Sequence, residues 1–278
     1  MNRFTRVTSL TLFAACTALA PGAHGQSYPT KPVRLIVPYA AGGATDTYAR
    51  VFAPRLTAAW GVPVIVDNRP GAGGNIGAGQ LAAAAPDGYT ILLNTSGQAI
   101  APALYRKLPY DIKALQPVVI LVRSAQVLMV HPSLPMNNVA DVVRLAKASP
   151  GKFNYGSTGV GSGPHLAGAL FASLAGIDIV HVPYKGDANL SPALLSNQVQ
   201  MAFLPSAAAL PHVRSKRLRP LAVASRGRSP YLPDLPTVTE SGVPGYELST
   251  YAAFYTRSGT PRDIVLKISN EMGRILKL

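Results

Sequence analysis

The sequence contains a single cysteine, Cys16, and only 12 acidic residues among its 278 positions. One thiol excludes an intramolecular disulfide framework, and a chain of this length can bury an adequate core without one. The five histidines are isolated, since none stands in an H-x-x-x-H pattern or at ligand spacing from a carboxylate. The sequence therefore predicts no metal site.

The motifs of common catalytic sites are also lacking. There is no G-x-S-x-G nucleophile turn and no Walker phosphate loop. The segment Gly77–Ala82 formally matches G-x-G-x-x-A, but it starts inside an expected helix and not directly after a strand, so we interpret it as chance. No carboxylate pair is marked out for acid–base work. The sequence thus predicts no catalytic residue and no cofactor.

Long apolar runs are absent except near the N-terminus. Two arginines precede the apolar run Val7–Ala20, and Ala23-His24-Gly25 has the small-x-small form of a cleavage site, which predicts a signal peptide over residues 1–25. The run is too short to span a bilayer, so we expect an exported protein. The alternative is a lipid anchor at Cys16, but Phe13 is a poor first residue for the corresponding cleavage box.

Basic residues are plentiful, and the formal net charge is +14. Such a balance suits an anionic ligand, an anionic surface or nucleic acid. The bases are scattered, however, and the one cluster, from Arg214 to Arg219 with Arg226 and Arg228 beyond, has no interleaved aromatic residues. Because it matches no nucleic-acid-binding module, we expect no nucleic-acid partner. The remaining interpretations of the basic residues are a solvated face of the protein and a general attraction for anions.

One pattern stands out near the start of the expected mature chain. Val33–Val37 is typical of a buried strand, and a polar loop, Tyr39–Asp46, with two adjacent glycines leads into an amphipathic helix. We expect Thr45 or Asp46 to cap that helix. A helix N-terminus after a strand presents free N–H groups and the positive end of a dipole, which suits a carboxylate or phosphate. The alternative is a plain connection between strand and helix.

The same unit recurs later in the chain. A short strand at Asn154–Ser157 leads through a glycine-rich loop into a helix from His165, and further polar loops follow strands at Thr95–Gln98 and Tyr184–Asp187. All but the loop at Thr95–Gln98 directly precede an expected helix. Ligands of open α/β sheets bind at the carboxyl ends of strands. We therefore expect two loop-bearing edges to face each other across a hinge and to bind a small anion without reaction.

The order of the expected elements predicts an α/β fold. Strands and helices alternate as in βαβ units with a parallel sheet. Pro117–Val122 and Gln126–Val130 are expected to be two separate strands. The irregular, proline-rich stretch from Ser225 to Pro244 suits a surface connection between domains.

Seven motifs stand in one order along the chain. They are Ile36–Asp46, Val66–Gly77, Ala84–Thr90, Pro102–Asp111, Phe153–Gly168, His181–Gly186 and Leu232–Glu247. With this set the sequence resembles the Bug family, the extracytoplasmic solute receptors of tripartite tricarboxylate transporters. The resemblance covers residues 28 to 276.

The resemblance implies a two-domain periplasmic receptor of the Venus-flytrap kind. Each domain is a mostly parallel sheet flanked by helices, and the ligand cleft lies between them. The implied division is a signal peptide over 1–25, a first domain of 26–123 plus 226–278, and a second domain of 124–225. The family continues beyond the position of Leu278, so the first domain is expected to be short at its C-terminus. The implied partners of a monomeric receptor are a small carboxylate or dicarboxylate and the permease subunits that receive it.

In the family, backbone N–H groups and hydroxyls of the facing loops hold the ligand carboxylate. The matching ligand-binding positions are Tyr39, Gly42, Gly43, Asp46, Thr95, Ser96, Ser157, Thr158, Gly161, Ser162, His165, Tyr184 and Gly186. Thr95 and Ser96 depart from the Ser-His type pair of the family. Ala169 and the segment Phe203–Pro205 also depart from it, and both bear on the choice of ligand.

Two alternatives keep the same fold. One is an exported enzyme acting on a small carboxylate, for which Asp46 and His165 are the loop residues that could act as base or nucleophile. The other is a ligand sensor that serves no transporter.

Overall fold

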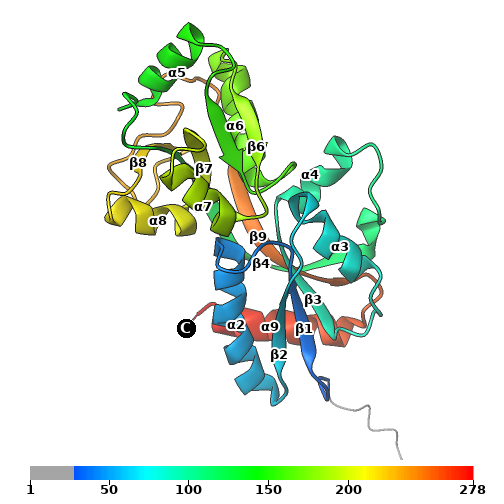
Figure 1. Ribbon diagram of the computed structural model, residues 1–278. Coiled ribbons are helices and arrows are strands. Elements are labelled where there is room, and N and C mark those ends of the chain that lie inside the picture. The colour runs from blue at the N-terminus through cyan, green and yellow to red at the C-terminus, as the bar shows by residue number, and fades with distance from the viewer. Residues whose placement is uncertain (1–27, 278) are drawn as a thin grey trace, which may run out of the picture. The chain divides into compact units, whose positions relative to one another are not determined.

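The computed structural model describes residues 28–277 (Figure 1). The expected signal peptide and Cys16 lie outside the described residues. By its contacts the chain from Lys31 onward forms one compact unit, and the description that follows concerns this unit.

The first half of the sheet has the strand order β2-β1-β3-β9-β4. Its strands are β1 (Val33–Val37), β2 (Val64–Asn68), β3 (Thr90–Thr95), β9 (Ser249–Arg257) and the first part of β4 (Leu115–Val130). β1 pairs in parallel with β2 and β3, whereas β9 runs antiparallel to β3 and β4. Its helices are α2 (Ala44–Trp60), α3 (Asn75–Ala82), α4 (Gly97–Leu104) and α9 (Arg262–Ile275), with short 3-10 helices η1 (Ala72–Gly74) and η2 (Ile112–Ala114).

The second half of the sheet is built on the end of β4. It adds β5 (Asn154–Ser157), β6 (Val180–Pro183), β7 (Met201–Pro205) and β8 (Arg219–Val223). β5 is parallel to β6 and β7, while β7 and β8 are antiparallel to β4. Its helices are α5 (Val139–Ala148), α6 (Gly163–Ala175), α7 (Asp187–Leu195) and α8 (Ser206–Arg214). The expected α/β fold is confirmed, with a mixed sheet.

The strand β4 joins the two halves. We expected two strands, Pro117–Val122 and Gln126–Val130, but the structure has one strand of 16 residues (Figure 1). The polar residues between the two expected strands suggested a loop, because the strand propensity of single residues is a weak guide. In the structure, the backbone pairing with β9 continues through these residues. The pairing register shifts near Pro117, where a proline can be accommodated in a sheet.

A second difference concerns the loop after β3. We expected no helix directly after it, but α4 begins at Gly97. A glycine at the start and Pro102 within the helix both lower helix propensity, which hid the element. The close approach of Gly97 to the Gly161 carbonyl shows why the position has no side chain, since a Cβ there would lie 2.9 Å from that oxygen.

Each half has its own apolar core. In the first half, Ile36, Leu81 and Leu92 are buried together with residues of β9. In the second half, the rings of Phe203 and Tyr246 stack and Phe171 packs edge-on against both, with ring centroids 5.8 to 6.2 Å apart. The Tyr246 hydroxyl donates to the Ala167 carbonyl at 2.9 Å.

The chain between β8 and β9 contributes to the second core. Val238 and Val243 from this stretch are buried there beside Tyr246. This stretch was expected to open the return to the first domain, but its apolar residues pack on the second half. The division into domains remains a proposal, in which the return to the first domain begins at β9.

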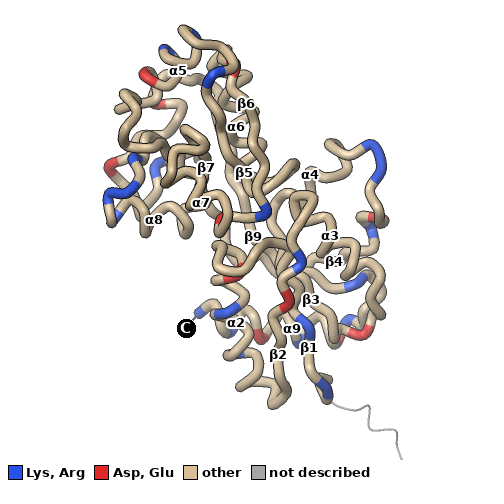
Figure 2. The backbone as a smooth tube through the Cα atoms, viewed as in Figure 1, with Lys and Arg blue, Asp and Glu red and all other residues tan. Residues whose placement is uncertain are grey.

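Basic residues are spread over helices and loops of both halves (Figure 2). One group lies at the end of α8 and just beyond it, where Arg214, Lys216 and Arg217 are exposed. Among residues 28–277, no helix has the length and hydropathy needed to cross a membrane.

Candidate ligand-binding cavity

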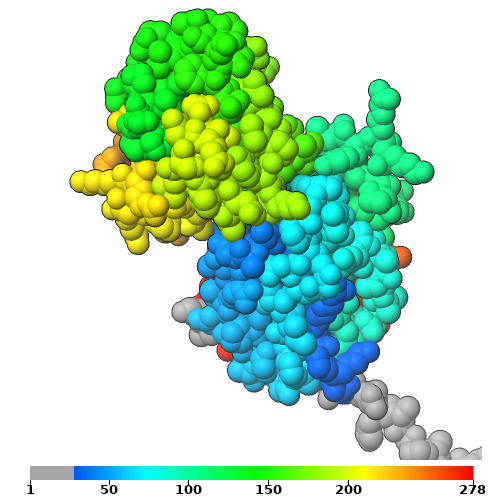
Figure 3. Space-filling model, viewed as in Figure 1, coloured from blue at the N-terminus to red at the C-terminus, as the bar shows by residue number. Residues whose placement is uncertain are grey.

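The loops of the two halves touch each other directly. The Ala40 N–H donates to the Lys185 carbonyl at 3.0 Å, which joins the loop after β1 to the loop after β6. Gly73 lies so close to the Val160 carbonyl that a Cβ would come within 2.0 Å of that oxygen. In the space-filling view the surface of α2 meets that of α7 and α8 (Figure 3). The structure is therefore a closed arrangement of the two loop-bearing edges.

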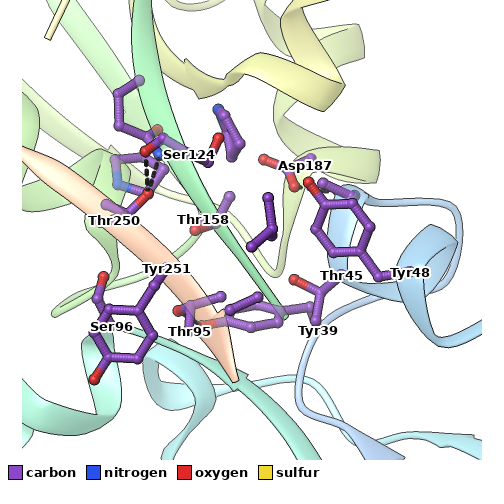
Figure 4. A pocket seen from close by; sticks show the side chains of 17 residues that line it. Tyr39, Thr45, Tyr48, Thr95, Ser96, Ser124, Thr158, Asp187, Thr250 and Tyr251 are labelled. Atoms are coloured by element: carbon purple, nitrogen blue, oxygen red, sulfur yellow. Dashed lines mark hydrogen bonds between the residues drawn. The ribbon is translucent and has the colours of Figure 1, made fainter. Parts of the chain in front are cut away.

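A cavity of about 40 Å³ lies between these edges (Figure 4). Its wall is rich in hydroxyl groups, with three tyrosines, one amide and one carboxyl group besides. The hydroxyl and phenol residues are Thr45, Thr95, Ser96, Ser124, Thr158, Thr250, Tyr39, Tyr48 and Tyr251, and the amide and the carboxyl belong to Gln126 and Asp187. Within the described residues no Lys, Arg or His lines this cavity.

Tyr39 and Thr95 form one side of the cavity. The Tyr39 hydroxyl lies 2.8 Å from the Thr95 Oγ1, and the Tyr39 side chain is buried. Burial raises the pKa of Tyr39 to about 12, so its phenol is neutral and can donate or accept a hydrogen bond. Both residues were predicted at the site, and both line the cavity.

Ser96 follows at the start of α4. Its N–H donates to the Tyr251 carbonyl at 3.0 Å, which fixes the residue against β9. Its side chain is 6% exposed, and its Oγ has no hydrogen-bond partner among the described residues. A buried hydroxyl without a partner is uncommon and marks a place where a ligand or water can bind.

Asp46, also predicted at the site, lies outside the cavity. Its Oδ2 accepts the Gly42 N–H and the Arg50 Nε, each at 2.8 Å, and its Oδ1 accepts the Asn68 amide at 3.0 Å. Burial alone would raise the pKa of Asp46, but these bonds together hold it below its ordinary value. The carboxylate fixes the loop from inside.

The expected helix cap was wrong. The N-cap of α2 is Gly43, with an extended backbone and no side-chain bond, and Thr45 and Asp46 lie within the first turn. The Gly42 N–H is taken by Asp46, so it is not the free donor that the glycine pattern suggested. Gly42 and Gly43 line a neighbouring hollow beside α7 and not the hydroxyl-rich cavity.

The glycine loop after β5 also satisfies most of its polar groups internally. The Ser157 Oγ lies 2.6 Å from the His181 Nε2 and accepts the Gly159 N–H at 3.1 Å. The Gly161 N–H donates to the His165 Nδ1 at 3.2 Å. Ser157, Gly161 and His165 were predicted at the site, but none of them lines the cavity.

The start of α6 is capped by Ser162. Its Oγ accepts the His165 N–H and donates to the Gly159 carbonyl at 2.7 Å, so it too is used within the loop. Thr158, in contrast, is buried and lines the cavity, as do Gly163 and Pro164 at the first turn of α6. Of the predicted residues in this loop, only Thr158 reaches the cavity.

The last predicted pair lies in the loop after β6. Tyr184 packs against the core of the second half, and Gly186 is the N-cap of α7. A Cβ on Gly186 would lie 3.2 Å from the Ala40 nitrogen, so this glycine permits the close approach of the two loops. Neither residue lines the cavity.

Asp187, the first residue of α7, was not predicted as a site residue. It is 8% exposed, its Oδ2 accepts the Ala44 N–H at 3.3 Å, and its Oδ1 has no partner among the described residues. Burial raises the pKa of Asp187 to about 6. The one signal in the sequence was the place of Asp187 at the end of a polar loop. An acidic residue there is normally explained by the preference of helix N-termini for negative charge.

Three more wall residues come from the middle of β4 and the start of β9. The Gln126 amide donates to the Thr250 Oγ1 at 2.8 Å, and that hydroxyl donates to the Ser124 carbonyl at 3.0 Å. The Gln126 Oε1 is buried without a partner in the described part of the chain. The sequence did not single out these residues. Gln126 was expected as the first residue of a buried strand, and Ser124 was expected to lie between two strands.

Among residues 28–277, no three His, Cys, Asp or Glu side chains come together in a way that could hold a metal ion. The cavity can supply hydroxyl and phenol groups, the first turns of two helices, one unpartnered amide oxygen and one carboxyl group. This set suits the binding of a small polar molecule.

The sequence profile of the tripartite tricarboxylate transporter family receptor matches residues 48–277. The chain belongs to this family. Protein BugT of Bordetella pertussis is 34% identical over 280 residues, which cover 100% of this chain and 86% of BugT. The resemblance to the Bug receptors seen in the motifs is confirmed.

Solved structures of relatives have the same fold. "R. palustris Rpa4515 with adipate" superimposes with a TM-score of 0.85 at 37% identity, over 88% of this chain and 83% of that one. "MatC (Rpa3494) from Rhodopseudomonas palustris with bound malate" gives 0.86 at 30% identity, over 90% and 86%. The periplasmic binding protein BugD gives 0.83 at 34% identity, over 90% and 83%. The chain is thus a solute-binding receptor of the periplasmic binding-protein fold.

Proposed function

We propose that the protein binds a small organic carboxylate or dicarboxylate in the hydroxyl-rich cavity and passes it, unchanged, to the permease subunits of a tripartite tricarboxylate transporter. It would act as a monomer in the periplasm. Two solved structures of similar proteins support the proposal, one with adipate and one with bound malate. Both are similar to this chain over most of its length.

The observation that carries the proposal is the meeting of two helix starts at one cavity. Ala44 and Thr45 belong to the first turn of α2, and Gly163 and Pro164 to the first turn of α6, and all four line the wall. Helix N-termini stabilise anions through the helix dipole and their free N–H groups. At α2 the Ala44 N–H is already donated to Asp187, so the start of α6 is the one that would face the ligand carboxylate. The unpartnered Ser96 Oγ adds a donor at the same place.

The proposed ligand contacts follow from the wall. Of the predicted residues, Tyr39, Thr95, Ser96 and Thr158 would contact the ligand, because they line the cavity. The others would act indirectly by holding the loops in place. They are Gly42, Gly43, Asp46, Ser157, Gly161, Ser162, His165, Tyr184 and Gly186.

Entry of a ligand would require the two edges to separate. The cavity is narrow, and the Ala40–Lys185 hydrogen bond and the Gly73–Val160 contact close its rim. β4 runs through both halves, and its pairing with β9 contains two register shifts. We place the hinge in these strands, since irregular pairing is a natural point for bending.

The proposal can be tested by calorimetry and thermal unfolding of protein freed of bound ligand by unfolding and refolding. Malate, succinate and adipate are compared with their neutral diamides. A carboxylate at 100 times its Kd should stabilise the fold by about 2.7 kcal/mol, and the diamides should not. Mass spectrometry should recover the carboxylate unchanged.

Two serine variants provide the matched control. Ser96→Ala should weaken carboxylate binding by about tenfold, the value of a hydrogen bond to a charged group. Ser215→Ala, at the exposed end of α8, should leave it unchanged. If no carboxylate raises the melting temperature, or if one is converted to product, the proposed function is wrong.

A further inference from the structure

The cavity contains a carboxyl group whose partner is missing. Asp187 is the one acidic residue in the wall, and no Lys, Arg or His joins it there among the described residues. We propose that Asp187 binds an ammonium group of the ligand, so that the receptor takes an amino-substituted carboxylate in preference to the plain dicarboxylate. This inference rests on the proposed function, because it assigns a second contact to the same ligand.

The two oxygens of Asp187 differ in their surroundings. The Oδ2 accepts the Ala44 N–H at the first turn of α2, which holds the carboxyl group in a fixed position between α7 and α2. The Oδ1 is buried and has no hydrogen-bond partner among residues 28–277. A fixed carboxylate with one unpartnered oxygen is a suitable acceptor for a ligand N–H, and an ammonium group would also supply the missing positive charge.

The neighbours of Asp187 cannot neutralise it. Tyr48 lies beside it, with its hydroxyl directed toward the carboxyl group (Figure 4), and the negative charge of Asp187 adds to burial in raising the pKa of Tyr48. The Tyr39 hydroxyl, from the loop after β1, is directed toward Thr95, and burial raises the pKa of Tyr39 to about 12. Asp187 forms no ion pair in the described part of the chain. An unpaired buried carboxylate is costly, and a ligand cation would relieve that cost.

The opposite side of the cavity suits the other end of such a ligand. In Figure 4, Ser96 lies across the cluster from Asp187, with Thr158 between them. The Ser96 Oγ is an unpartnered hydroxyl, and α6 begins at the same wall, so this side favours a carboxylate. One side of the cavity thus suits a negative group and the other a positive one.

The competing chemistry is a protonated Asp187 that donates to a ligand carboxylate. It would favour dicarboxylates and would strengthen their binding as the pH falls. The two cases therefore give opposite selectivity and opposite pH dependence, and titration calorimetry can separate them.

The test compares matched probes on the purified mature protein at pH 8: L-aspartate with succinate, and L-glutamate with glutarate. Each pair differs by one ammonium group. We expect the amino-substituted member of at least one pair to bind at least tenfold more tightly, the strength of a charge-assisted hydrogen bond. Equal or tighter binding of both plain dicarboxylates overturns the inference while leaving the proposed function intact. Binding of none of the four overturns the inference, and it overturns the proposed function as well if malate and adipate also fail to bind.

The variant Asp187→Asn should abolish that preference and bring the two members of the pair within about threefold of each other. The amide keeps an oxygen for the Ala44 N–H, and the melting temperature reports whether the variant folds. Asp178→Asn, at the exposed opposite end of β6, is the matched control and should keep the wild-type preference. Retention of the preference in Asp187→Asn overturns the inference.

The pH dependence needs no variant and gives an independent readout. Between pH 8 and pH 5 the amino acid ligands keep their charges, whereas Asp187, with its pKa raised to about 6, takes up a proton. Affinity for the amino-substituted ligand should fall about tenfold in the wild type and much less in Asp187→Asn. Tighter dicarboxylate binding at pH 5 that is lost in Asp187→Asn would show a neutral donor and overturn the inference.

The comparison of wild type with Asp187→Asn also accounts for the other titrating groups near Asp187. Tyr39 and Tyr48 stay neutral in this range because their pKa values are raised. On the other side of Asp187, His212 of α8 lines the neighbouring hollow, and burial and the charge of Arg217 lower its pKa. His212 is unchanged in Asp187→Asn, so its protonation cancels between the two proteins.

Discussion

Two buried aspartates stand at the starts of two helices, and they have opposite surroundings. Asp46 is in the first turn of α2 and is 2% exposed, while Asp187 opens α7 and is 8% exposed. Asp46 accepts hydrogen bonds from Gly42, Arg50 and Asn68. Asp187 accepts the Ala44 N–H, its own backbone N–H also stabilises the carboxylate, and its Oδ1 has no hydrogen-bond partner among the described residues.

The pKa values follow from these surroundings. The pKa of Asp46 is lowered because its bonds outweigh burial, and that of Asp187 is raised to about 6 because burial outweighs the backbone N–H groups of Ala44 and of Asp187 itself. Folding therefore satisfies one carboxylate and leaves the other in need of a partner. Burial alone does not show whether an aspartate holds the fold together or binds a ligand. The number of hydrogen bonds that its carboxylate accepts from the protein does.

The largest expected effect comes from removing the satisfied carboxylate. Asp46→Ala leaves the Gly42 N–H and the Asn68 amide without their acceptor and Arg50 without its partner. We expect the free energy of unfolding to fall by about 3 kcal/mol, measured by urea denaturation at pH 7. The control Glu271→Ala removes a side chain that pairs with the largely exposed Arg274 and should cost less than about 1 kcal/mol. Similar losses in both variants would show that Asp46 is no anchor.

A smaller effect of opposite sign is expected at Asp187. Its folded pKa of about 6 lies above the ordinary value of 3.8, so the folded protein takes up a proton first as the pH falls. Stability from this group is therefore present below the unfolded pKa and is lost as the pH rises through the folded one. Relative to Asp187→Asn, the wild type should lose about 1 to 2 kcal/mol of unfolding free energy between pH 5 and pH 7.

The difference between the two proteins is the quantity to measure, because other groups titrate in the same range. His165 and His181 have pKa values lowered by burial, and in the wild type alone they would oppose the effect of Asp187. Their contributions cancel between wild type and variant. A difference in unfolding free energy that does not change with pH would contradict the raised pKa.

Much of the fold could be predicted from local pattern. The buried strand at Val33–Val37 was predicted with its observed bounds, and the recurring strand, glycine loop and helix gave the α/β class. Local pattern was misleading where tertiary pairing overrides it. The polar residues within β4 suggested a break, but the ladder to β9 carries the strand through them.

The site could be predicted less well, because a motif does not show where its polar groups point. The glycine loops near Gly42 and Gly161 were correctly located, yet their N–H groups are bonded within the loops. The cavity wall instead includes residues such as Gln126 and Thr250, which are 124 positions apart. The contact between Asp187 and Ala44 spans 143 positions, and no local signal reports it.

The smallest expected effect concerns the two glycines that lie next to these carboxylates. Gly42, held by Asp46, has a φ of +85°, whereas Gly43, beside Asp187, has a φ of −84° that any residue can adopt. Gly42→Ala should lower the free energy of unfolding by about 1 kcal/mol because a Cβ is strained there. In Gly43→Ala the new Cβ would lie 3.5 Å from the Asp187 Oδ2, an ordinary contact. Its stability should stay within about 0.5 kcal/mol of the wild type, since a less flexible unfolded chain offsets small losses. Urea denaturation of both variants measures the difference, and a larger loss at Gly43 would mean that the space beside Asp187 is already filled.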